Sequence, residues 1–93
     1  MARVDLIKNS AFMVLGGLAF VFDKTNSTPT ILVYNLKNIS QYTKFVIMDD
    51  GRILFTDSNM SEANKWKSIA LVERNKSTLI EGYKEWVSIQ RGE

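Results

Sequence analysis

The sequence predicts a small α+β domain, with a mainly antiparallel four-stranded sheet, an N-terminal helix and two C-terminal helices. Four short runs rich in β-branched and aromatic residues occupy the middle of the chain, and turn residues bound each of them. Apolar residues recur at helical spacing before and after these runs. The chain has 93 residues, of which 45% are apolar. We therefore expect residues 1–93 to fold as a single domain without support from a metal or a disulfide.

The N-terminal segment Arg3–Leu15 is the first predicted helix. An apolar stripe follows one of its sides at helical spacing, and Gly16–Gly17 would end it. Leu6 and Met13 point to the opposite side, so this helix would be apolar on two faces. A strand over Phe12–Leu15 is the competing interpretation of the same residues.

The four central runs are predicted as strands. They are Leu18–Phe22, Thr30–Leu36, Lys44–Met48 and Arg52–Thr56. Between the last two, Asp50-Gly51 supplies the positive φ values that a tight hairpin needs. The connections are too short for helical crossovers, which favours antiparallel pairing.

A first C-terminal helix is predicted to begin at Asn59, which forms a pattern resembling a capping box with Glu62. Its apolar stripe runs through Ala63, Trp66, Ile69 and Ala70, which indicates that the Trp66 side chain is a core anchor. Leu71 and Val72 fall off this stripe, so the helix either ends near Ala70 or is contacted on more than one side.

A break at Asn75 precedes the second C-terminal helix. It is predicted to open with a capping box of Thr78 and Glu81 and to end near Gln90. Its apolar face consists of Leu79, Tyr83, Trp86 and Val87, with Ile80 at the edge. Gly82 is expected to weaken this helix by up to ~1 kcal/mol relative to Ala.

The predicted strands carry apolar side chains on both faces. In Thr30–Leu36, Ile31 and Val33 point one way. Leu32 and Tyr34 point the other way, whereas a sheet with one wet face alternates apolar with polar residues. We expect the N-terminal helix to cover one face and the C-terminal pair the other, or a partner chain to cover part. About 400 Å² of uncovered apolar surface would forgo on the order of 10 kcal/mol, so self-association is predicted.

The residue types argue against an enzyme. The chain has no Cys and no His, which excludes disulfides, thiol nucleophiles, Ser-His-Asp triads and imidazole acid–base chemistry. Asp49, Asp50 and Asp57 are the carboxylates that could form a magnesium site or serve an acid–base role, but turn and cap roles are favoured. Gly16–Gly17 is no phosphate loop, because G-x-G-x-x-G and G-K-[ST] are absent. We expect no metal and no cofactor.

A basic cluster in the C-terminal part supplies an alternative function. Lys65, Lys67, Arg74 and Lys76 surround Trp66, and cations beside an aromatic ring can bind nucleic acid through phosphate contacts and stacking. The order of elements is similar to that of double-stranded-RNA-binding domains, without the basic helix N-terminus that such domains use. A solvated helix face is the simpler interpretation, since Lys65 and Lys67 are about 160° apart around a helix. The net charge of +2 also argues against a strongly basic wrapping protein.

The expected function is that of a small non-enzymatic binding or regulatory protein that contacts a protein partner and forms a homodimer. Chains of this size and type are common among phage-encoded proteins that modulate their host. Ala11–Phe22 carries no charge but is shorter than the ~20 residues of a membrane span, so we expect buried elements and a cytoplasmic protein. The residues predicted at the partner interface are Leu6, Met13, Trp66, Leu71 and Val72.

Overall fold

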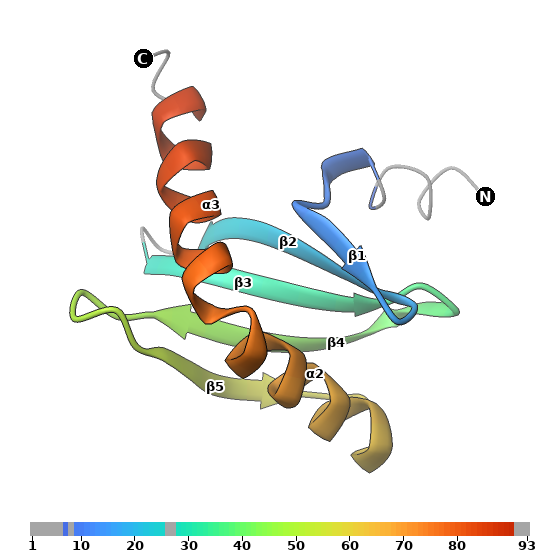
Figure 1. Ribbon diagram of the computed structural model, residues 1–93. Helices are drawn as coiled ribbons and strands as arrows, with labels where there is room; N and C mark the ends of the chain where they lie inside the picture. Colours follow the sequence, from blue (N-terminus) through green and yellow to red (C-terminus); the bar gives the residue numbers. More distant parts are fainter. Residues whose placement is uncertain (1–6, 8, 26–27, 91–93) are drawn as a thin grey trace.

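Five antiparallel strands form one meandering sheet in the computed structural model, and two helices follow it (Figure 1). The structure describes residue 7 and residues 9–25 and 28–90. The strands are β1 (Met13–Leu15), β2 (Leu18–Thr25), β3 (Thr28–Asn35), β4 (Asn38–Ile47) and β5 (Ile53–Ser58), and they pair in chain order. The helices are α2 (Glu62–Arg74) and α3 (Lys76–Gln90). The α+β class, the antiparallel sheet and the two C-terminal helices are thus confirmed.

The predicted N-terminal helix over Arg3–Leu15 is not among the elements that the structure describes, and its extension to Leu15 is wrong. Of the described residues in this segment, Ile7, Asn9 and Ser10 have helical backbone. Met13–Leu15 is strand β1 and pairs with Leu18–Phe20, so the sheet has five strands instead of four. Gly16 and Gly17 have φ angles of 57° and 79°, which lets them reverse the chain in a two-residue hairpin turn instead of ending a helix. Residues 3–6 and 8 of the predicted helix lie outside the described residues.

The strands extend beyond their predicted bounds. Strand β2 continues past its predicted end at Phe22, since Asp23 pairs with Thr30 and Lys24 with Pro29. The tight turn before β5 is confirmed: Gly51 has a φ of 87°.

The first C-terminal helix does not use the predicted capping box. Ser61 is the N-cap of α2, and its side chain accepts a hydrogen bond from the Asn64 N–H at 3.4 Å. Asn59 joins the sheet instead. Its Oδ1 accepts from the Tyr42 N–H at 2.7 Å, and its Nδ2 donates to the Ser40 carbonyl at 3.0 Å. The amide side chain therefore continues the β4–β5 pairing up to the start of the helix.

The second helix also starts earlier than the sequence pattern indicates. Asn75 is the C-cap of α2, as the predicted break requires, and α3 begins at the next residue, Lys76. Thr78 and Glu81 lie inside α3 and do not form its N-terminal capping box. The joint between the helices is therefore a single residue.

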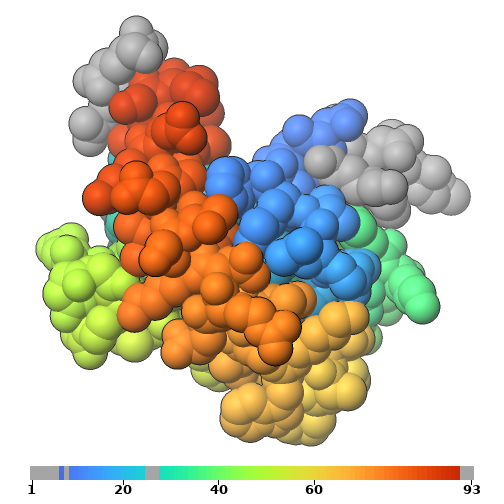
Figure 2. All heavy atoms as spheres, in the orientation of Figure 1, coloured from blue at the N-terminus to red at the C-terminus, as the bar shows by residue number. Residues whose placement is uncertain are grey.

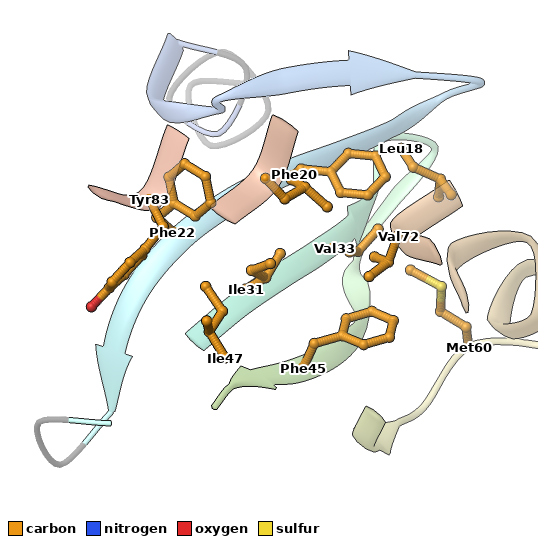
Figure 3. Close-up of a cluster of buried hydrophobic side chains, with 11 residues drawn as sticks. Leu18, Phe20, Phe22, Ile31, Val33, Phe45, Ile47, Met60, Val72 and Tyr83 are labelled. Atoms are coloured by element: carbon orange, nitrogen blue, oxygen red, sulfur yellow. The ribbon is translucent and has the colours of Figure 1, made fainter. Parts of the chain in front are cut away.

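The core lies between one face of the sheet and the two helices. Figure 1 shows α2 and α3 in front of the strands, and Figure 3 shows side chains from both layers meeting. The buried cluster consists of Leu18, Phe20, Phe22, Ile31, Val33, Phe45, Ile47, Met60, Val72, Leu79 and Tyr83. Neighbouring strands place these residues side by side, since Phe20 pairs with Val33 and Ile31 with Phe45. Among the described residues, no helix is long and apolar enough to cross a membrane.

The buried side of α2 agrees with the predicted stripe only at Ile69, which packs against the core. Ser68 and Val72 are buried, whereas Trp66 is 59% exposed, so the prediction that Trp66 anchors the core is wrong. Ser68 is tolerated in the core because its hydroxyl donates to the Asn64 carbonyl at 2.9 Å within the same helix. Because this buried position holds a polar residue, the pattern of apolar residues in the sequence does not indicate which side of α2 is buried.

The predicted apolar face of α3 is confirmed, and Gly82 belongs to it. Leu79, Gly82 and Tyr83 are buried, and Trp86 packs against the core. A Cβ at Gly82 would lie 2.5 Å from Cε1 of the Phe12 ring. The glycine therefore lets the residue before β1 press its ring onto the helix.

Gly82→Ala is expected to destabilise the domain by about 1 kcal/mol, because a steric cost of about 1–3 kcal/mol exceeds the gain of ~1 kcal/mol in helix propensity. The cost stays small since the Phe12 ring is 38% exposed and can swing outward. In a Phe12→Ala background the same change meets no ring and is expected to stabilise by up to about 1 kcal/mol. Urea unfolding of the four proteins measures both effects. Stabilisation by Gly82→Ala with Phe12 in place would contradict the explanation.

Candidate interface on the open face of the sheet

The side of the sheet that faces away from α2 and α3 is the candidate site. No helix or strand that the structure describes lies behind the sheet in Figure 1. We call this side the open face. Its side chains alternate with the core residues along each strand. They are Val14 of β1; Ala19, Val21 and Asp23 of β2; Thr30, Leu32 and Tyr34 of β3; Tyr42, Lys44 and Val46 of β4; and Leu54 and Asp57 of β5.

Each strand carries an apolar side chain on the open face, and Leu32 of β3 lies opposite Lys44 of β4. Val21 pairs with Leu32 between β2 and β3, and Val46 pairs with Leu54 between β4 and β5. Val21, Leu32 and Val46 are half-buried by their neighbours in the sheet. Leu54 is 40% exposed, and Val14 at the other edge of the sheet is 42% exposed. Apolar side chains therefore reach from one edge strand to the other.

Polar side chains border this apolar strip at the β4–β5 side. Lys44 pairs with Asp57, and the irregular register beside Lys44 places Asp57 on the same face as Leu54. The Tyr42 hydroxyl donates to Asp57 Oδ2 at 3.0 Å. The hydrogen bond to this carboxylate, followed by its negative charge, raises the pKa of Tyr42 above its ordinary value of 10.0. Tyr42 therefore remains a neutral hydrogen-bond donor at physiological pH.

The predicted interface residues do not share one surface. Leu6 lies outside the described residues. Met13 and Leu71 are partly buried and pack against the core, and Val72 is only 2% exposed within it. Trp66 is a surface residue on α2. None of the predicted interface residues was chosen from the open face, although the apolar side chains on both faces of the predicted strands indicate such a surface.

The environment of Trp66 on α2 is polar. Its Nε1 donates to Glu62 Oε2 at 3.1 Å, and Lys65 Nζ lies 5.4 Å from the centroid of its ring. The same lysine forms an ion pair with Glu62 at 3.1 Å, and this hydrogen bond, the largest cause, lowers the pKa of Glu62. The indole is thus held against the helix by local contacts.

The basic residues of the nucleic-acid alternative are dispersed. Lys65 is paired with Glu62, whereas Lys67 Nζ donates to the Gly16 carbonyl at 2.6 Å on another side of α2. Arg74 is exposed in the last turn of α2, and Lys76 is half-buried at the start of α3. These cations do not line one groove along the helix.

The carboxylates considered for magnesium have separate roles. Asp50 pairs with Arg52 Nε at 2.7 Å, and its pKa is lowered chiefly by the hydrogen bond from the Arg52 backbone. Asp57 accepts from Tyr42, and Asp49 is exposed in the turn. In the described part of the chain, no group of three or more carboxylate-bearing residues is placed to hold a metal ion.

Comparison with protein-family models, with curated proteins and with solved structures finds no match. Function is therefore inferred from the open face and its chemistry.

Asp57→Asn is expected to bring the pKa of Tyr42 back toward 10.0, because the amide still accepts a hydrogen bond but removes the negative charge. Because the pKa of Tyr42 is higher in the folded than in the unfolded state, its hydrogen bond to Asp57 stabilises the fold fully at pH values below the unfolded-state pKa. This stabilisation is lost as the pH rises through the folded-state pKa. An NMR titration of the Tyr42 ring measures the change. Asp23→Asn on β2 is the matched control and is expected to leave Tyr42 unaffected. An identical Tyr42 pKa in the wild type and in Asp57→Asn would contradict the assignment.

Proposed function

We propose that this chain is a small non-enzymatic binding protein that contacts protein through the open face, and that its first partner is a second copy of itself. The observation that carries the proposal is the mismatch between the strands and the helices. The strands carry apolar side chains on both faces, while α2 and α3 cover one face only. Apolar side chains on the open face are therefore not covered by any helix or strand that the structure describes, and such a surface favours binding to another protein.

Association through the open face depends on how much apolar surface it buries. Burial of about 400 Å² on each of two protomers would contribute about 20 kcal/mol, against an association cost of roughly 4–15 kcal/mol. Val14 and Leu54 at the two edge strands are exposed and available for contact, whereas Ala19 and Thr30 on the same face are fully buried.

The register of the strands favours a second copy as the occupant. Strand β3 is central in the sheet, with β2 on one side and β4 on the other. A two-fold axis along β3 places Leu32 opposite its own counterpart and β4 opposite β2 of the second copy. Lys44 of β4 then lies opposite the row of Val21 on β2 of the second copy, and Asp23 is two residues further along that strand on the same face.

The residue inventory supports binding rather than catalysis. The sequence lacks His and Cys. On the open face, the hydroxyl of Tyr42 and the carboxylate of Asp57 bind each other, which makes them groups that orient a partner at the border of an apolar contact. A different protein with an apolar surface would compete with the second copy for the same face, which gives a regulatory protein a simple means of exchange between self-association and target binding.

Leu32→Glu is expected to raise the dissociation constant of the dimer by at least about 100-fold, because it brings two carboxylates together at the two-fold axis. Within one protomer the new carboxylate lies beside Lys44, so the monomer is expected to stay folded. Sedimentation equilibrium over a range of concentrations measures the association, and circular dichroism checks the fold.

Ile89→Lys is the matched control, since Ile89 is 71% exposed on α3 and away from the open face. This variant is expected to dimerise as the wild type does. A wild-type chain that remains monomeric at all concentrations, or a Leu32→Glu chain that dimerises unchanged, would overturn self-association through this face.

A further inference from the structure

We propose that a small cavity between the tips of two hairpins and helix α2 binds a phosphate-type oxyanion. The cavity has a volume of about 150 Å³. Its lining includes Gly16 and Gly17 of the β1–β2 turn, Asn35 and Lys37 at the β3–β4 turn, and Asn64 and Lys67 of α2. This inference is independent of the proposed function, because these groups lie at the turns and on α2 and not on the open face.

Lys67 is held at the cavity by the β1–β2 turn. Its Nζ donates to the Gly16 carbonyl at 2.6 Å, which leaves two of its three N–H groups for a ligand. A Cβ on Gly16 would lie 2.8 Å from Lys67 Cε, so the absence of a side chain there permits the approach. The ammonium group also masks the carbonyl oxygen, which would otherwise repel an anion.

The β3–β4 turn that carries Lys37 is equally well ordered by hydrogen bonds. Asn35 Oδ1 accepts from the Lys37 N–H at 3.0 Å, and Asn35 Nδ2 donates to Gln41 Oε1 at 3.0 Å. The Leu36 N–H donates to the Gly17 carbonyl at 3.0 Å and so joins the two turns. Figure 2 shows the blue β1–β2 hairpin beside the green β3–β4 turn and the gold start of α2.

The described lining of the cavity carries positive charge. Two lysines line it, and no Asp or Glu is among the lining residues that the structure describes. Glu62, in the first turn of α2, is engaged by Lys65 at 3.1 Å. The ammonium groups of Lys37 and Lys67 and the side-chain amide of Asn64 can donate hydrogen bonds to the oxygens of a tetrahedral oxyanion. A cavity of this volume admits one phosphate group.

The same chemistry is offered by free phosphates and by the phosphodiesters of a nucleic acid. Titration of the ¹⁵N-labelled full chain with inorganic phosphate, pyrophosphate and an oligothymidylate separates these sources. We expect the amide signals of Gly16, Gly17 and Lys37 to shift. Shifts with phosphate or pyrophosphate alone identify a free oxyanion as the ligand, while tighter binding of the oligonucleotide at the same signals identifies a nucleic-acid backbone.

Lys67→Gln and Lys37→Gln are each expected to weaken the binding about tenfold, since each removes one charge-assisted contact. Lys65→Gln is the matched control on the same helix, because Lys65 is paired with Glu62 and does not line the cavity. It is expected to change the affinity less than about twofold. Circular dichroism checks that the variants fold. No shift at the cavity with any of the three ligands, or unchanged binding by Lys67→Gln and Lys37→Gln, would overturn the proposal.

Discussion

One constraint organises this structure: a single sheet carries apolar side chains on both faces, and its two helices lie on the same side. Asn75 alone joins α2 to α3, and a one-residue joint does not let the chain pass around the edge of the sheet. Both helices therefore pack onto the face that carries Phe20, Ile31 and Phe45. The open face is therefore left without a helix although its strands carry apolar side chains there, and the proposed dimer follows from that.

The hairpin tips gain importance from the same arrangement. Because α2 crosses the sheet near the β1–β2 turn, Lys67 reaches the Gly16 carbonyl although the two residues are far apart in sequence. At the other end, the glycine at position 82 brings α3 close to the Phe12 ring, whose centroid lies 4.9 Å from that of the Phe22 ring. Glycines thus set the closeness of β1 to both helices: one lies in a turn and the other in the middle of a helix.

Much of the fold could be predicted because the strands have simple local signals. Runs such as Thr30–Leu36 are rich in apolar residues that point to both faces of a sheet, which is a local signal for a strand. Asp50-Gly51 predicts a tight turn from its residue types alone. The short strand Met13–Leu15 fitted helical and extended patterns alike, and only pairing with β2 decides between them. The stripe through Trp66 was misassigned because the buried position of α2 is occupied by Ser68, whose hydroxyl is satisfied inside the helix.

The sequence by itself determined the class of fold, the two-sided apolar strands and the absence of imidazole and thiol chemistry, because each depends on residue type and local spacing. The tertiary structure decided which face stays open, since that follows from the side on which the helices pack. It also decided that Lys37 and Lys67, thirty positions apart, line one cavity. Such a meeting depends on the path of the chain through three elements, and no local pattern of charge or hydropathy encodes it.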